Sequence, residues 1–267
     1  NAMSIIRRHL LRMSLGLGAG LAAGGGGVIA TRLGQSGELA RAERSVHVFG
    51  TTARLTVLHA RRARAEDAAD AAIEELATVQ RVMSLYQPDS EVSRLNRAGA
   101  LDRPHRYLSA VLEQAAAVSR WSAGAFDITV QPIWQTYADA AGRGRLPDDR
   151  ARADAAALAD WRQVRAGDRR IALGRPGMAI TLNGIAQGFA ADRVAEVLRE
   201  HDITHALVNT GEVFALGRRA DAAPWRVGIQ HPRQTDAHLT ATGLSDRCVA
   251  TSGDYATPFT ADFRHHH

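Results

Sequence analysis

Residues 178–192 read Met-Ala-Ile-Thr-Leu-Asn-Gly-Ile-Ala-Gln-Gly-Phe-Ala-Ala-Asp. The apolar run predicts a short strand, Ala179–Leu182, that passes through an Asn183-Gly184 turn into a helix over residues 184–200. Asn183 is a favourable N-cap, and Gly184 lets a ligand approach the backbone. The unpaired N–H groups of the first helical turn would then face a bound anion, and phosphate is the anion that such a site usually binds. A plain strand-to-helix turn without a ligand is the alternative.

Composition limits the class of protein. The chain has 267 residues, of which 45% are hydrophobic, so it can bury the core of about one domain. All 33 basic residues are Arg, which excludes Schiff-base chemistry and a lysine general base. Arg7, Arg8 and Arg12 supply three charges of the formal +5, so the body of the chain is nearly balanced. This balance argues against nucleic-acid binding, which needs basic residues gathered on one face.

Cysteine and histidine offer little for metal binding. Cys248 is the only cysteine, so it has no disulfide partner and no zinc spacing, and its strand-like apolar surroundings predict that it is buried. The last three residues are His, but adjacent histidines on a strand alternate faces, so at most two would converge on one metal.

The first thirty residues are interpreted as a tag remnant and a targeting signal that are not part of the folded domain. Residues 1–3, Asn-Ala-Met, read as the remnant of an expression tag. Residues 4–30 resemble a twin-arginine export signal, because Arg7-Arg8 precedes a weakly apolar stretch that ends in the small-residue spacing of Val28-Ile29-Ala30. We therefore expect a periplasmic protein exported by the twin-arginine route. An uncleaved anchor in the inner membrane is the alternative.

The rest of the chain predicts an α+β fold, because helices precede a strand-rich second half. Alternating apolar residues around Gly50 predict a hairpin within residues 45–60. Apolar stripes predict helices over residues 64–86, 107–122, 148–161 and 184–200. Predicted strands lie at Ile171–Leu173, Ala179–Leu182, His205–Val208, Val213–Leu216, Trp225–Ile229, Leu239–Gly243 and Arg247–Thr251.

Four segments combine polar side chains with glycine or aromatic residues. The first, residues 83–96, could hold a planar ring and hydrogen-bond its edges, or it could be a capping box in which Ser90, Ser93 and Asn96 satisfy a helix start. In the second, residues 121–132, a helix C-cap explains Gly124 but not Asp127, which needs a partner if it is buried. Residues 209–212 and 250–255 each follow a strand, where open sheets tend to bind ligands.

In order and spacing these segments resemble the flavin transferase family, also called ApbE-like or FAD:protein FMN transferases. The match begins at about Val46, and it implies a single α+β domain over residues 45–267 with a mixed or antiparallel sheet and flanking helices. The motifs that carry it are Met83-x-x-Tyr86 with Asp89-Ser90-Glu91, Gly124-x-Phe126-Asp127, Asn183-Gly-Ile-Ala-Gln-Gly188 with Asp192, Asn209-x-Gly211 and Ala250-Thr-Ser-Gly253.

The resemblance implies FAD as the flavin donor and Mg²⁺ at its pyrophosphate. A Thr or Ser hydroxyl of another protein would attack, leaving FMN as a phosphoester and releasing AMP. The implied catalytic positions are Gln187 and Thr181, and the implied metal ligand is the Gly184 carbonyl. The implied FAD-binding positions are Met83, Tyr86, Ala125, Phe126, Asp127, Thr181, Gly184, Gln187 and Ser252.

The sequence departs from the family pattern at informative places. Thr181 stands where many members have an acidic residue, and Gln187 stands where they have Lys, so a positive charge beside the phosphates is missing. Glu212 and Val213 replace a second glycine and an Asp. The family's metal-binding Asp and Thr would follow His267, so we expect a domain that is truncated at its C-terminal end. One carbonyl cannot hold magnesium, and we expect weak or absent activity from residues 31–267.

These departures and the export signal resemble the NosX branch, which accompanies nitrous oxide respiration. That branch implies a partner, the periplasmic FMN-acceptor domain of a NosR-like membrane flavoprotein. Two other functions stay open. One is an FAD-binding flavin carrier with little transferase activity, motivated by Gln187 and Thr181, and the other is an FAD pyrophosphatase in which water replaces the hydroxyl.

Overall fold

The computed structural model describes residues 39–254, 258–260 and 262. The chain divides into two units, residues 1–36 and 37–267, and every described residue belongs to the second. The tag remnant, the export signal and the terminal histidines lie outside the described residues. Within the described ranges, no helix combines the length and apolarity needed to cross a membrane.

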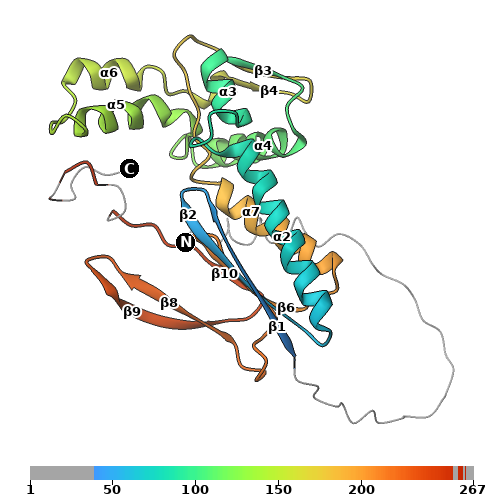
Figure 1. Cartoon of the computed structure of the whole chain (residues 1–267). Helices are drawn as coiled ribbons and strands as arrows, with labels where there is room; N and C mark the ends of the chain where they lie inside the picture. Colours follow the sequence, from blue (N-terminus) through green and yellow to red (C-terminus); the bar gives the residue numbers. More distant parts are fainter. Residues whose placement is uncertain (1–38, 255–257, 261, 263–267) are drawn as a thin grey trace, which may run out of the picture. The chain divides into compact units, whose positions relative to one another are not determined.

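An antiparallel five-stranded sheet has the order β1-β2-β6-β7-β10 (Figure 1). β1 pairs with β2 in a hairpin whose two loop residues, Phe49 and Gly50, have φ of 52° and 74°. Two positive φ angles are typical of the type I′ turn that suits such hairpins. The predicted hairpin around Gly50 is therefore confirmed. The strands are β1 (Ala40–Val48), β2 (Thr51–His59), β6 (His205–Asn209), β7 (Val213–Leu216) and β10 (Arg247–Val249).

Helices α2 (Arg62–Met83) and α7 (Ala186–Glu200) cover one face of this sheet (Figure 1). Alternate residues of β2, namely Ala53, Leu55 and Val57, are buried in the core that they share with the helices. Four of the eight buried residues of α2 are alanines, whose short side chains let the helix approach the sheet closely. Both helices were predicted, although α2 ends at Met83, before Tyr86.

A second hairpin, formed by β8 (Trp225–His231) and β9 (Gln234–Leu244), shares a smaller core with the main sheet. Its centre comprises Leu58, Ala215, Trp225, Val227 and Leu244. Leu58 directly follows Val57 in β2, and successive side chains of a strand point to opposite faces of the sheet. The second core, which contains Leu58, therefore lies on the face of the sheet opposite the helices. The middle strands are thus buried on both faces.

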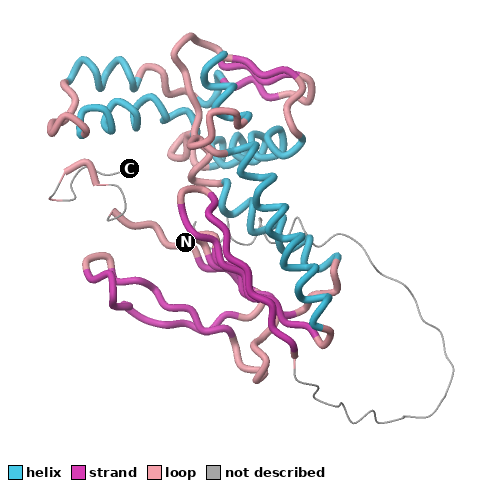
Figure 2. Tube along the Cα trace, in the orientation of Figure 1, coloured by secondary structure: helices cyan, strands magenta, loops and turns pink. Residues whose placement is uncertain are grey.

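The remaining elements form a helical region with a small antiparallel sheet of order β3-β5-β4 (Figure 2). Its α-helices are α3 (Glu91–Ala98), α4 (Arg106–Trp121), α5 (Gln131–Ala141) and α6 (Asp149–Ala156). Two 3₁₀ helices, η1 (Ile128–Val130) and η2 (Trp161–Gln163), precede and follow the α5–α6 pair. The strands are β3 (Ala100–Asp102), β4 (Val164–Ala166) and β5 (Arg170–Leu173). Helices, strands and antiparallel sheets together confirm the predicted α+β class.

Three local predictions are wrong. Residues 179–182 join no strand ladder, because the Ile180 backbone groups pair with the Asn96 side chain and the Thr181 N–H donates to the Ile128 carbonyl of η1. The helix predicted over 148–161 stops at Ala156, and Asp160 caps the next 3₁₀ turn instead. Cys248 is exposed, because β10 is the last strand of the sheet and has a neighbour on one side only.

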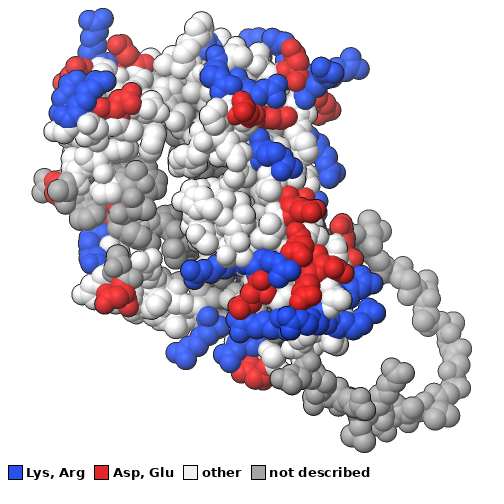
Figure 3. Space-filling view, in the orientation of Figure 1, with Lys and Arg blue, Asp and Glu red and all other residues white. Residues whose placement is uncertain are grey.

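Charges are interspersed on the surface. Figure 3 shows acidic and basic side chains mingled over the face in view. Ion pairs at the surface of the described part of the chain include Arg44–Asp70 and Arg62–Glu66. Exposed pairs of this kind contribute little to stability, typically below about 1 kcal/mol each.

Candidate functional site

The Asn183-Gly184 turn lies against the turn that contains Phe126. A Cβ built on Gly184 would be 3.3 Å from Phe126 Cε2, so the aromatic ring packs directly on the Gly184 backbone. Close by, the Thr181 N–H donates to the Ile128 carbonyl at 2.7 Å. Packing and a hydrogen bond thus bring together Phe126, Thr181 and Gly184, three of the positions at which FAD binding is expected.

The start of α7 differs from the prediction. Ile185, not Asn183, is the N-cap residue, and no side chain caps the helix. Asn183 is exposed, and its N–H donates to Thr181 Oγ1 at 3.2 Å. The predicted cap was wrong because the Asn-Gly pair forms a tight turn of its own before the helix begins.

This turn leaves backbone donors free. The Leu182 carbonyl accepts from the N–H groups of both Ile185 and Ala186, at 2.9 and 2.7 Å. Among the described residues, nothing accepts a hydrogen bond from the N–H groups of Gly184, Gln187 and Gly188. Free N–H groups at the positive end of a helix favour an anion. We call the N–H groups of these three residues the anion cradle.

Gln187 ties α7 to the turn that follows β6. Its Nε2 donates to the Thr210 carbonyl at 3.0 Å. A Cβ on Gly211 would lie 2.6 Å from the same Nε2, and Gly211 has a φ of +102°, so only glycine suits this position. Asn209 Oδ1 closes the turn by accepting from the Gly211 N–H at 3.0 Å. The Asn209-Thr-Gly-Glu motif is therefore docked on the first turn of α7.

Two carboxylates lie beside this junction. Glu212 Oε2 is 3.6 Å from the Cβ position of Gly188, and burial together with Asp192 raises the pKa of Glu212. Burial of the carboxylate and the nearby Glu196 raise the pKa of Asp192 too, against an opposing effect of Arg199. Neither carboxylate has an ion pair or a hydrogen bond with another described residue. In the sequence, Asp192 belonged to one of the family motifs, whereas Glu212 was noted only as a departure from the family pattern.

Both carboxylate oxygens of Asp127 accept hydrogen bonds from other residues of the chain. Its Oδ1 accepts from Thr129 N at 2.7 Å and from Thr129 Oγ1 at 2.6 Å, and its Oδ2 accepts from Trp161 N at 3.2 Å. The half-buried carboxylate therefore has the partners that its position requires. It shapes the Ala125–Asp127 turn, in which Ala125 is exposed.

The predicted ring-binding residues differ in exposure. Met83 is buried in the main core at the end of α2, whereas the Tyr86 side chain is 65% exposed. The Tyr86 ring lies near the β1–β2 turn, with its Cε2 3.5 Å from the Cβ position of Gly50. Tyr86 thus offers an aromatic face to a ligand, and Met83 supports the segment from within.

The polar residues after Tyr86 have structural roles. Ser90 caps α3, with its Oγ accepting from the Ser93 N–H at 3.0 Å, so the capping interpretation is confirmed for this pair. Asn96 does not cap. It hydrogen-bonds both backbone groups of Ile180 and so supports the segment that leads to the Asn183-Gly184 turn. Ser252 follows β10 and is exposed.

A cavity of about 550 Å³ adjoins the Asp127 turn. Ile128, Trp161 and Ser119 line it together with other residues of α4. The Ser119 Oγ and Trp161 Nε1 are buried and have no hydrogen-bond partner in the described part of the chain. Unpaired buried donors are unusual, and a bound water or ligand oxygen normally explains them.

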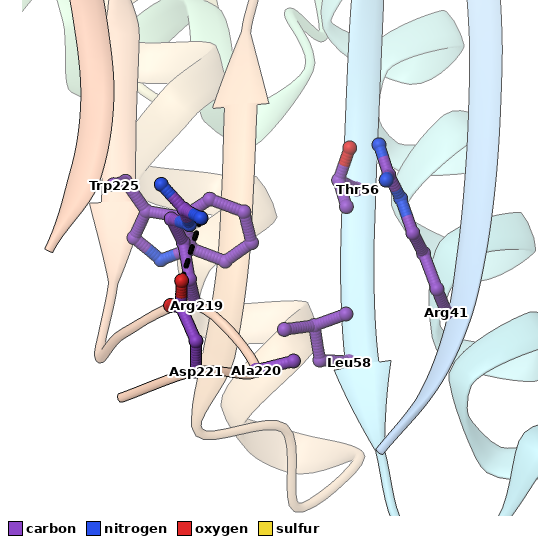
Figure 4. A pocket seen from close by; sticks show the side chains of 7 residues that line it. All are labelled: Arg41, Thr56, Leu58, Arg219, Ala220, Asp221 and Trp225. Carbon is purple, nitrogen blue, oxygen red and sulfur yellow. Dashed lines mark hydrogen bonds and ion pairs between the residues drawn. The ribbon is translucent and has the colours of Figure 1, made fainter. Parts of the chain in front are cut away.

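A second cavity, of about 490 Å³, lies on the opposite side of the main sheet, away from the anion cradle. Figure 4 shows Trp225 and the Arg219–Asp221 pair on one side, with Thr56 and Arg41 on the other. Both of its arginines already pair with carboxylates, Arg41 with Glu43 and Arg219 with Asp221. This cavity therefore offers no free charge to a ligand.

The described residues do not form a magnesium site. No group of three or more His, Cys, Asp or Glu side chains among them is arranged to hold a metal ion. The Gly184 carbonyl is at an exposed residue, but one carbonyl does not satisfy the six oxygen ligands that Mg²⁺ prefers.

Comparison with known proteins identifies the family. The profile of the ApbE family matches residues 49–267. The FAD:protein FMN transferase of Treponema pallidum is 34% identical over 245 residues, which cover 82% of this chain and 67% of that protein. The enzyme of the same name from Haemophilus influenzae is 29% identical over 69% of this chain, which spans only 57% of its length.

Solved structures agree in fold. The ApbE protein of Thermotoga maritima superposes with a TM-score of 0.74 at 25% identity, over 85% of this chain and 75% of that one. The apo form of the Pseudomonas stutzeri flavinyl transferase ApbE gives 0.71 at 25% identity, over 86% and 73%. By sequence profile, by sequence identity and by fold, this chain belongs to the ApbE family.

Proposed function

We propose that this protein transfers FMN from FAD to a Thr or Ser hydroxyl of an acceptor protein and releases AMP. The observation that carries the proposal is the anion cradle beside Phe126. The pyrophosphate is the part of FAD that such a cradle suits, because free N–H donors and the positive end of α7 favour phosphate oxygens. Relatives named FAD:protein FMN transferase support the same reaction.

The residues would act mainly by positioning. The cradle would hold the pyrophosphate, and the exposed ring of Tyr86 offers a stacking surface for the flavin. Thr181 and Gln187 set the shape of the turn, through the Ile128 and Thr210 carbonyls respectively. Phosphoryl transfer depends largely on such alignment and on stabilisation of charge. Gln187 supplies no positive charge, so the cradle binds phosphate through neutral donors.

Magnesium dependence is proposed from the resemblance alone, since the described residues do not complete a site. The direct test is transfer measured with magnesium chloride and with EDTA. Loss of transfer in EDTA would support a metal requirement, and equal rates would remove it.

We also propose that the protein works in the periplasm on the flavin-binding domain of a NosR-like membrane protein. The support is the twin-arginine pattern of residues 4–30 and the resemblance to the NosX branch. Cell fractionation of the native protein, with an Arg7→Lys/Arg8→Lys variant as control, tests the location. Equal export of both proteins would overturn the twin-arginine route.

The function itself is tested by incubating the full-length protein with FAD, magnesium chloride and the acceptor domain. We expect a flavin-fluorescent acceptor band and stoichiometric AMP, both absent when the acceptor Thr is changed to Ala. AMP release without acceptor would indicate an FAD pyrophosphatase. FAD binding without AMP or labelled acceptor would indicate a flavin carrier, which the absence of a charged side chain at Gln187 favours as the second candidate. Either result would overturn the transferase.

A further inference from the structure

We propose that a groove between α4 and β4 binds an extended segment of the acceptor protein. The inference rests on the proposed function and deepens it, because it names where the protein substrate docks. The α4–β4 groove is the cavity of about 550 Å³ beside the Asp127 turn, and its walls are one side of α4 and the strand residues Val164 and Ala166. Its lining residues on α4 run from Arg106 to Arg120, a length on the order of 20 Å, which an extended chain covers with about six residues.

The wall formed by β4 carries unpaired backbone groups. β4 is the last strand of its sheet, and β5 is its one partner among the described residues. The Gly167 N–H donates to the Arg170 carbonyl at 3.1 Å, and alternate residues of an antiparallel strand turn their backbone groups to the same side. Arg165 therefore faces β5, whereas Val164 and Ala166 face the other edge. The Val164 N–H bonds within the preceding turn, which leaves the Val164 carbonyl and both backbone groups of Ala166 without a partner in the described chain.

Two side-chain donors continue this row of unpaired groups toward the end of α4. The Ser119 side chain is fully buried and lines the groove, as does Trp161, and neither the Ser119 Oγ nor the buried Trp161 Nε1 has a partner among the described residues. A small molecule that reached these two donors would leave the edge of β4 unpaired. A polypeptide supplies a carbonyl and an N–H at every residue, and addition of a strand to a free sheet edge is a recurring mode of peptide recognition.

Charges at the groove favour a polar segment over an apolar one. Arg106, Glu113, Arg120 and Asp168 line it, and none of the four forms an ion pair with another described residue. Both signs are present, so a segment with acidic and basic side chains can pair with the rim while its backbone pairs with β4.

The groove leads to the turn at which FAD binding is expected. The Trp161 N–H donates to Asp127 Oδ2 at 3.2 Å, so the deep end of the groove lies directly behind the Ala125–Asp127 turn. Ile128 also lines the groove, and its carbonyl accepts from the Thr181 N–H at 2.7 Å, three residues before Gly184. A segment that leaves the groove at this end is therefore placed beside the proposed reaction site. This continuity identifies the acceptor as the occupant.

The first test is the rate of transfer as a function of acceptor concentration for full-length Ala116→Phe, which fills the groove from the helix side. Its matched control is Ala117→Phe, because Ala117 is the next residue of α4, is exposed and does not line the groove. We expect KM for the acceptor domain to rise by about tenfold or more in Ala116→Phe, with kcat and the Kd for FAD within about twofold of the wild type, since docking away from the chemistry is uniform binding. The control should match the wild type.

A variant of β4 probes the other wall. Ala166→Pro removes an N–H that β5 does not use, and proline is tolerated on an edge strand. It should raise KM for the acceptor in the same way, whereas Arg165→Ala, an exposed residue of the same strand that does not line the groove, should not.

The indole N–H resonance of Trp161, identified by its loss in Trp161→Phe, gives a readout that needs no turnover. Titration with the acceptor domain in the absence of FAD should move this resonance and leave that of Trp134, on α5, in place. Failure of the reaction is thereby distinguishable, because a wild type that labels no acceptor would still show the shift.

Equal KM values for Ala116→Phe and Ala117→Phe would overturn the proposal, as would a Trp161 resonance that the acceptor does not move. A shift with FAD alone would make the groove part of the flavin site. A shift that follows the concentration of the protein itself would make it an interface between two copies. Either of these results would also overturn the proposal.

Discussion

Asn96 satisfies both backbone groups of Ile180. Its Nδ2 donates to the Ile180 carbonyl at 2.9 Å, and its Oδ1 accepts from the Ile180 N–H at 2.8 Å. Ile180 is fully buried, so water does not compete for these groups. The Asn96 amide thus provides the two hydrogen bonds that a neighbouring strand would otherwise provide, and it holds in place the segment that leads to the Asn183-Gly184 turn.

Replacing Asn96 by Ala should therefore destabilise the protein strongly. Two buried backbone groups lose their partners, and each unsatisfied group costs about 1–3 kcal/mol. We expect a loss of about 2–4 kcal/mol in the free energy of unfolding, measured by urea denaturation. Asn183→Ala is the matched control, because Asn183 is exposed and does not cap α7, and it should cost less than about 0.5 kcal/mol. A larger loss for Asn183 than for Asn96 would contradict both assignments.

The contacts of Asn96 also illustrate which parts of the fold cannot be predicted from the sequence. Regular elements with a strong period, such as α2, α4, α7 and the hairpin at Gly50, were predicted because local apolar spacing determines them. The strand at 179–182 was not realised, because its pairing depends on an amide far away in the sequence. α5 was missed, and only Ala140 of its residues is buried, so this helix contributes almost nothing to the core.

The candidate site, too, could be predicted from the sequence only in its locally determined parts. The Asn-Gly turn, its helix and the motif after β6 could be located from residue types. Their mutual contacts could not, because Phe126 against Gly184 and Gln187 against Gly211 are tertiary contacts that no local pattern encodes. The raised pKa of Glu212 is likewise a property of the folded neighbourhood and not of its motif.

Gly184→Ala should weaken FAD binding. The new methyl group would lie 3.3 Å from Phe126 Cε2, so the ring or the turn must move and the cradle must shift with it. We expect the Kd for FAD, measured by flavin fluorescence, to rise by about fivefold to tenfold, equivalent to about 1 kcal/mol. Phe126→Leu in the same chain should recover part of this loss. Equal affinities for Gly184→Ala and the wild type would place the flavin elsewhere.

Two buried serines should respond oppositely to alanine. Ser90 Oγ caps α3 and also donates to the Ser84 carbonyl at 2.5 Å, so Ser90→Ala should cost about 1–2 kcal/mol of unfolding free energy. Ser119 Oγ has no partner among the described residues, so Ser119→Ala should be neutral or stabilising by up to about 1 kcal/mol. Urea denaturation of both variants measures the two changes in unfolding free energy. A cost at Ser119 similar to that at Ser90 would mean that a bound molecule satisfies its hydroxyl in the wild type.

Stability should depend on pH through Glu212. Its pKa in the folded protein is raised above the ordinary value of 4.5, so folding favours the protonated form. The stabilising contribution is complete below pH 4.5 and is lost as pH rises through the folded pKa. Glu212→Gln, which stays neutral, should therefore gain stability relative to the wild type between pH 4 and pH 8, as measured by thermal unfolding. Glu200→Gln is the control and should show no such trend, and a constant difference at Glu212 would refute the shifted pKa.

Gln187→Lys should tighten FAD binding. The Gln187 amide already reaches the Thr210 carbonyl beside the cradle, and a lysine ammonium there could keep that hydrogen bond while adding a positive charge near the phosphates. We expect the Kd for FAD to fall by about threefold to tenfold at low ionic strength, and the gain to shrink as salt rises. Gln187→Met separates charge from packing, because it keeps the side-chain length but loses the donor, and it should bind FAD more weakly than the wild type. A lysine variant that binds FAD no better than the methionine variant would show that the pyrophosphate does not lie on the first turn of α7.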